Sequence, residues 1–87
     1  MSDRPFSTTE LDDLTCHAIL AQDRYGNYAS THEALGVALE EWTELVNAVH
    51  ANDIEAVRDE AIDLAAVLLR LAYQCRWSEA MKARSVK

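Results

Sequence analysis

Residues that interrupt helices are rare in this chain, which has only two glycines and one proline among its 87 residues. Glycine and proline have the lowest helix propensities, so a sequence with so few of them favours long helices. Hydrophobic residues make up 49% of the chain, which is typical of a folded domain rather than a disordered segment. We therefore expect one all-α domain that spans residues 1–87.

Helix starts are marked three times by the same spacing. A Ser or Asn stands three residues before a Glu at Ser7–Glu10, Ser30–Glu33 and Asn52–Glu55. A side-chain oxygen at the first position and a carboxylate at the second together satisfy the unpaired N–H groups of a first turn. The predicted helices cover about 8–22, 31–51 and 53 to at least 76, followed by a flexible tail over about 78–87.

The second and third predicted helices differ in how their apolar residues are distributed. Those of the second share an arc of roughly 120°, and they are Leu35, Ala38, Leu39, Trp42, Leu45, Val46 and Val49. Trp42 lies centrally on this arc, so we expect it to pack in the core. The polar residues of the third helix occupy a strip of only roughly 80°, and they are Glu60, Asp63, Arg70 and Gln74. So much apolar surface predicts a four-helix-type bundle that a homodimer or homotetramer completes.

Charge and cysteine content limit the partners and the compartment. Fifteen acidic residues against eight Lys and Arg give a net charge of −7, which argues against a nucleic-acid partner. The longest strictly apolar run, 64–69, is too short to cross a membrane, and the first residues show no secretory-signal pattern. Cys16 and Cys75 form no CxxC pair, as expected for reduced thiols. We expect a cytoplasmic protein without a membrane partner.

Five carboxylates stand at helical spacing on either side of the predicted turn at Asn52. They are Glu40, Glu41 and Glu44 in LEEWTEL, and Glu60 and Asp63 in DEAID. Glu44 and Glu60 each lie eight residues from Asn52, and Glu41 and Asp63 each lie eleven. Equal distances from the turn of an antiparallel hairpin mean equal heights, so four carboxylates should form two stacked pairs. Such pairs repel unless a cation lies between them, and their oxygen ligands suit Mg²⁺ or Mn²⁺.

The pattern EExxE at 40–44, then ExxD at 60–63 after a gap of fifteen residues, resembles the MazG-like, all-α nucleoside triphosphate pyrophosphohydrolases. The stretch YGNYASTHEALGVALEE is similar to the approach to the first motif in small phage and bacterial members. The resemblance covers roughly 25–73 and implies Mg²⁺-dependent hydrolysis of an NTP or dNTP to the monophosphate and pyrophosphate. It also implies residue roles: Glu41, Glu44, Glu60 and Asp63 match the metal ligands, and Glu40 matches an accessory Glu that orients water or a second metal.

Substrate contacts are marked less clearly. Family members often place basic residues after the third helix on the phosphates, and Arg70 is our geometric choice because it shares a strip with Asp63. Asn27, between Tyr25 and Tyr28, lies in a loop where a nucleobase would be read, and His32 is a candidate to cap or line the site. The three histidines show no metal-ligand spacing, so His17 and His50 are expected to be ordinary. The preferred base and sugar and the number of metal ions are not indicated.

Three other interpretations stay open from the sequence. Acidic residues at 40–44 are also typical of a solvated helix face, and Arg58 or Arg70 would neutralise Glu60 and Asp63 in ordinary ion pairs. Ile62 stands where many family members have Gly, which fits a non-catalytic helical dimerisation or regulatory module that keeps the fold. Phosphoribosyl-ATP pyrophosphohydrolase, a relative of the same enzymes, is the third possibility.

Overall fold

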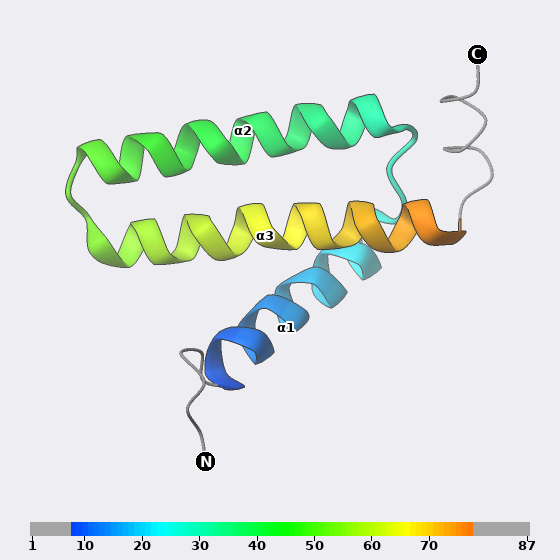
Figure 1. Ribbon diagram of the computed structural model, residues 1–87, viewed down its shortest axis with the longest axis horizontal. Coiled ribbons are helices and arrows are strands. Elements are labelled where there is room, and N and C mark those ends of the chain that lie inside the picture. The colour runs from blue at the N-terminus through cyan, green and yellow to red at the C-terminus, as the bar shows by residue number, and fades with distance from the viewer. Residues whose placement is uncertain (1–7, 78–87) are drawn as a thin grey trace.

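The computed structural model describes residues 8–77, which form three helices (Figure 1). Helix α1 spans Thr8–Tyr25, α2 spans Thr31–His50 and α3 spans Ile54–Trp77. The described part of the chain contains no strand, so the predicted all-α class is confirmed. None of these three helices has the length and apolar composition that a bilayer crossing requires. The predicted cap at Ser7 and the predicted flexible tail lie outside the described residues.

The start of α2 confirms one predicted cap. Ser30 has an extended backbone, and its Oγ accepts a hydrogen bond from the N–H of Glu33 at 3.2 Å. The Glu33 carboxylate reaches back and accepts from the N–H of Ala29 at 2.6 Å. This resembles a capping box, except that the Glu33 carboxylate binds the N–H of the residue before the N-cap rather than that of Ser30 itself. The preceding helix, α1, continues three residues beyond its predicted end, to Tyr25.

The turn between α2 and α3 differs from the prediction. The N–H of Asp53 donates to the carbonyl of Ala48 at 3.2 Å, and the N–H of Asn52 donates to that of Val49 at 3.0 Å, which is a Schellman motif. Asn52 takes the left-handed position of that motif, with φ of 57°. The N-cap of α3 is instead Asp53, whose carboxylate accepts from the N–H of Ala56 at 3.1 Å. The predicted cap at Asn52 is wrong because closing α2 already requires that residue.

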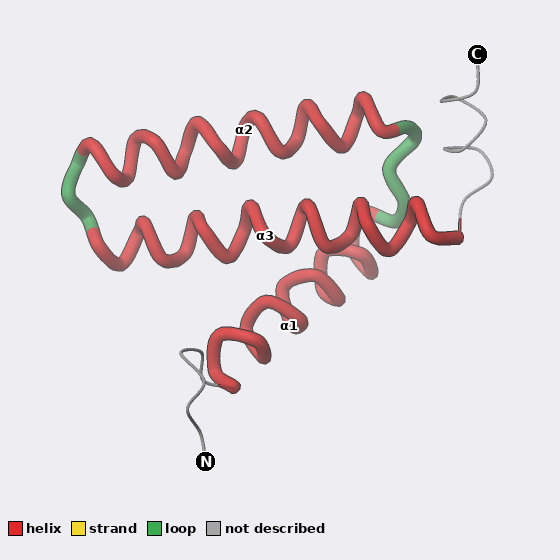
Figure 2. Tube along the Cα trace, in the orientation of Figure 1, coloured by secondary structure: helices red, strands yellow, loops and turns green. Residues whose placement is uncertain are grey.

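Helices α2 and α3 lie side by side and antiparallel, as predicted, and α1 crosses α3 at an angle (Figure 2). Small residues make the contact between α2 and α3. Ala34 has no exposed surface, and Ala38, Val67 and Tyr28 complete the buried cluster. Because the α2 side chains in this contact are alanines, the two helix backbones approach closely.

The predicted apolar arc of α2 is only partly covered. Leu35, Leu39 and Val49 are each about half exposed. Trp42 retains 53% of its surface exposed, so the prediction that it packs in the core is wrong for the single chain. The reason is that α3 packs on the side of α2 that carries Ala34 and Ala38, next to the bulkier residues of the arc rather than on them.

The polar strip of α3 faces the interior of the molecule. Arg70 and Gln74 are 7% and 5% exposed, and Glu60 and Asp63 are half-buried. The Gln74 amide accepts from the N–H of Tyr28 at 2.8 Å and donates to its carbonyl at 2.6 Å, so it satisfies both backbone groups of one loop residue. The large apolar residues that α3 leaves exposed are Ile54, Leu68, Leu69 and Tyr73.

The turn assignment predicts opposite outcomes for two adjacent residues. Asp53→Ala should lower the free energy of unfolding by about 1 kcal/mol, because the Ala56 N–H loses its acceptor. Asn52→Gly should leave it unchanged or slightly raised, because glycine adopts a positive φ without strain. Urea denaturation of both variants measures the difference, and an undiminished stability of Asp53→Ala would contradict the assignment.

Candidate metal centre

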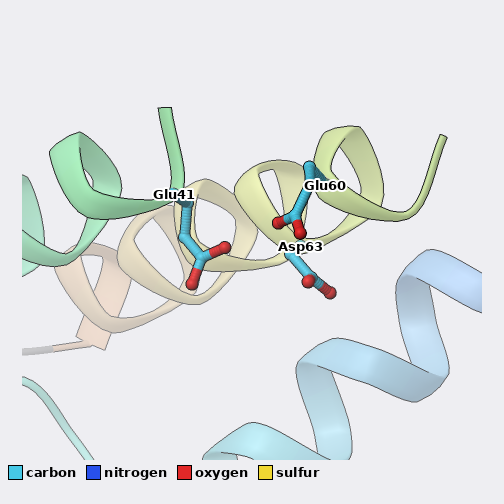
Figure 3. Close-up of side chains that lie close together, drawn as sticks. All are labelled: Glu41, Glu60 and Asp63. Carbon is cyan, nitrogen blue, oxygen red and sulfur yellow. The ribbon is translucent and has the colours of Figure 1, made fainter. Parts of the chain in front are cut away.

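Three carboxylates from two helices meet between α2 and α3 (Figure 3). Glu41 belongs to α2, and Glu60 and Asp63 lie one turn apart on α3. One ligand oxygen from each residue lies within 4.8 Å of those from the other two. Figure 3 shows the Glu60 carboxylate turned toward Glu41, whereas the Asp63 carboxylate points away from Glu41, toward the blue ribbon of α1.

Two oxygens of this cluster lack any compensation in the described chain. Oε1 of Glu41 and Oε1 of Glu60 are buried, and neither has a hydrogen-bond partner. Removing a carboxylate oxygen from water without a donor costs free energy, and the cost is larger for a charged group. A shared proton or a bound cation would offset this cost. The all-oxygen donor set fits Mg²⁺ or Mn²⁺, which prefer hard ligands of this kind.

Burial and mutual repulsion raise the pKa of two of these carboxyls. For Glu41 the loss of hydration is the largest cause, followed by the negative charges of Glu44 and Asp63. For Glu60 the loss of hydration also comes first, and a hydrogen bond with the Glu44 carboxyl and the charge of Glu44 also raise its pKa. Glu41 and Glu60 therefore bind protons more readily than ordinary surface carboxylates do, as expected for buried acids close to other negative charges.

The other two predicted carboxylates lie at the edge of the cluster. Glu44 is exposed and lies beside Glu60, but it is not among the three residues whose ligand oxygens converge. Glu40 is also exposed and lines the cleft next to Glu41. The structure thus brings together three of the four predicted metal ligands and leaves the fourth adjacent to them.

Neither Arg58 nor Arg70 forms an ion pair with the cluster. Arg58 lies 2.5 Å from Asp13 and 3.7 Å from Asp59. Arg70 donates to Gln22, Tyr28 and Gly26 instead, as described below. The interpretation in which either arginine neutralises the acids in a direct pair therefore does not hold for the described residues.

Helix α1 contributes a residue that the sequence did not single out. Nδ1 of His17 lies 3.1 Å from Oδ1 of Asp63, and His17 also lines the cleft beside the cluster. The contact joins residues on different helices, so no spacing along the chain marks it. The only local signal is the separation of four residues between Asp13 and His17, which puts both on one face of α1.

A cleft of about 550 Å³ adjoins the cluster, within the size range of small-molecule sites. Its polar walls come from all three helices and the loop between α1 and α2, and they include His17, Asn27, Glu33, Glu40, Glu41, Asp63 and Arg70. Tyr25 and Tyr28 supply aromatic surface. His32 is exposed on the first turn of α2 and is not among the lining residues.

Arg70 fixes the loop that forms one wall of this cleft. Its guanidinium donates to Gln22 Oε1 at 3.2 Å, and to Tyr28 Oη and the Gly26 carbonyl at 3.0 Å each. It also stacks on the Tyr28 ring, 4.5 Å from the centroid. A guanidinium has five N–H donors, so these bonds leave two for a ligand. In this structure Arg70 fixes the loop between α1 and α2. Its contact with a phosphate stays a prediction.

Comparison with known protein families, with curated proteins and with solved structures finds no match to this chain. The resemblance to MazG-like enzymes therefore stays a hypothesis. It rests on the motif spacing between residues 40 and 63, together with the approach sequence before it.

The raised pKa of Glu60 predicts the stability of one variant in the absence of metal. Folding raises this pKa, so the stability that the protonated carboxyl supplies below its unfolded pKa is lost as pH rises through the folded pKa. Glu60→Gln should therefore raise the melting temperature at neutral pH and change it little in acid. Thermal melts in EDTA from acid to neutral pH measure this, with Glu55→Gln, on the exposed first turn of α3, as the control. A gain that is the same at every pH would contradict the assignment.

Proposed function

We propose that this protein hydrolyses a nucleoside or deoxynucleoside triphosphate to the monophosphate and pyrophosphate in the cytoplasm. Glu41, Glu60 and Asp63 would hold the required Mg²⁺, with Mn²⁺ as the alternative ion and Glu44 as an additional ligand. The observation that carries the proposal is the convergence of three carboxylates, two of which have buried oxygens without partners. A divalent ion bound there supplies positive charge to the carboxylates and to phosphate oxygens at once.

The charge of the cleft explains why a nucleotide would need the ion. Glu33, Glu40, Glu41 and Asp63 all line the cleft, so it repels a triphosphate when no cation is present. A divalent ion at the cluster reverses the local sign. Tyr25 is 69% exposed and borders the same cleft, which suits stacking on a base, and Asn27 lies next to it for contact with a base edge.

In the proposed reaction, water attacks the α-phosphorus and the bond to the α–β bridging oxygen breaks, so pyrophosphate leaves. We assign to Glu40 the acceptance of the proton that the water loses, because Glu40 is exposed in the cleft beside Glu41. We assign to Arg70 the use of its two remaining N–H donors on a phosphate oxygen. Its three bonds to the loop would keep the guanidinium in place while it does so.

A panel of NTPs and dNTPs, extended to phosphoribosyl-ATP and incubated with purified protein and Mg²⁺, tests the reaction. At least one member should yield monophosphate and pyrophosphate. Asp63→Asn and Glu44→Gln should each lower turnover by about 100-fold or more without changing the helical circular dichroism, because an amide cannot replace a ligating charge. Glu55→Gln should behave as wild type. Release of orthophosphate alone, or no turnover of any member, would contradict the proposal.

We also propose that the working unit is a homodimer or homotetramer. Twelve large hydrophobic residues of the described chain are exposed, and no large side chain is fully buried. By helical periodicity, Leu35, Trp42 and Val49 of α2 and Leu68 of α3 fall on the side of the hairpin that faces away from the cleft. A second copy packed on that side would complete a four-helix bundle.

Trp42→Glu tests this association. Burying an unpaired carboxylate at the interface costs at least about 3 kcal/mol, so the dissociation constant should rise roughly 100-fold or more. Sedimentation equilibrium measures it, and Thr43→Glu, one position along α2 and outside the apolar arc, is the matched control. A wild-type chain that sediments as a monomer at micromolar concentration would contradict the proposed oligomer.

The same exposed apolar surface favours the second candidate function, a non-catalytic dimerisation or regulatory module. The two candidates differ in their response to ligand. A ligand that binds only the native state must raise the melting temperature. The enzyme therefore predicts a higher melting temperature with Mg²⁺ and a non-hydrolysable nucleotide, whereas the module predicts no change.

A further inference from the structure

We propose that His17 is a positioning residue for the metal centre, whose imidazole holds the Asp63 carboxylate in the orientation that binds the ion. The proposal rests on the proposed function. It starts from the 3.1 Å contact between Nδ1 of His17 and Oδ1 of Asp63. Within residues 8–77, this is the only hydrogen-bonding or ionic contact that the Asp63 side chain makes.

The three carboxylates of the cluster are held in different ways. Oε1 of Glu41 and Oε1 of Glu60 have no hydrogen-bond partner. Oδ1 of Asp63, in contrast, contacts His17, which belongs to α1. The Asp63 carboxylate thus contacts His17 and also places an oxygen within 4.8 Å of those of Glu41 and Glu60. Carboxylates and histidines that ligate metals are usually oriented by such partners, and losing one partner weakens metal binding about 10–100-fold.

His17 itself is not a ligand in this arrangement. The group whose ligand atoms all lie within 4.8 Å of one another contains the three carboxylates and excludes the His17 nitrogens. The imidazole instead contacts the carboxylate of one ligand, with Nδ1 3.1 Å from Oδ1 of Asp63. His17 therefore acts on the ion through Asp63.

The packing of α1 on α3 keeps the imidazole in place. Ala18, the residue after His17, is only 7% exposed. The backbone of α1 at this point is therefore packed against the rest of the molecule. Two further polar contacts flank it along the same pair of helices: Asp13 with Arg58 at 2.5 Å and Gln22 with Arg70 at 3.2 Å. The contact between His17 and Asp63 thus joins two helices that other interactions also hold together.

Exposure argues against a purely structural role for this contact. The side chains of His17 and Asp63 are 50% and 37% exposed, and solvent weakens an ion pair at such a site. The fold therefore gains little stability from the pair. The effect of removing His17 should appear in metal affinity far more than in folding.

The affinity for Mn²⁺ alone, measured from the electron paramagnetic resonance signal of the free ion, tests the proposal without any turnover. His17→Leu should raise the dissociation constant about 10–100-fold. His17→Asn should keep most of the wild-type affinity, because its amide nitrogen occupies nearly the same position as Nδ1. His50→Leu, at the exposed C-terminal end of α2, should have no effect. Circular dichroism verifies that each variant is folded.

A second variant distinguishes a role of His17 in orienting Asp63 from a role in packing α1 on α3. Asp13→Asn weakens the neighbouring contact between α1 and α3 without touching the cluster. If Asp13→Asn lowers Mn²⁺ affinity as much as His17→Leu does, or if His17→Leu binds like wild type, the proposal is overturned. Pulsed resonance that detects an imidazole nitrogen bound directly to Mn²⁺ would also overturn it. Wild-type protein that binds no Mn²⁺ would instead remove the metal centre itself, and with it the proposed function.

Discussion

The close approach of α2 and α3 is the constraint on which the rest of this structure depends. Alanines such as Ala34 and Ala38 form the contact, and small side chains allow two helix backbones to come together. The same approach brings Glu41 against Glu60 and Asp63. The same packing that buries the apolar residues brings the negatively charged acids close together. A proton or a cation between them would offset their repulsion.

Two polar side chains are buried in this molecule, while many of its large apolar side chains are exposed. Arg70 and Gln74 are among the most buried side chains of α3, and they are satisfied by the loop between α1 and α2. Buried polar groups are tolerated when their hydrogen bonds are made, and here those bonds shape a cleft next to the acids. Residues such as Trp42 and Leu68 are left on the outer surface, which is where a second copy would bury them.

Helix α1 completes the candidate site rather than the core. It rests mainly on α3, and three of its polar side chains make the contacts that orient it there. One of them, His17, reaches the carboxylate cluster, and another, Gln22, reaches Arg70 at the cleft. The first helix therefore contacts both the carboxylate cluster and the cleft wall that Arg70 holds in place.

The sequence alone determined the helices, the antiparallel hairpin and the approach of Glu41 to Glu60 and Asp63, because helix periodicity and distance from a turn are local properties. It also predicted that Glu44 would join them, but Glu44 lies at the edge of the cluster. It did not indicate that His17 meets Asp63, that the donors of Arg70 go to the loop, or that Trp42 stays exposed. Those outcomes depend on which side of each helix packs against its neighbours, and residue spacing within one helix does not specify that side. Asp53 caps α3 in place of Asn52 for a related reason. Asn52 already takes the left-handed conformation that ends α2, so the next residue is the one that caps α3.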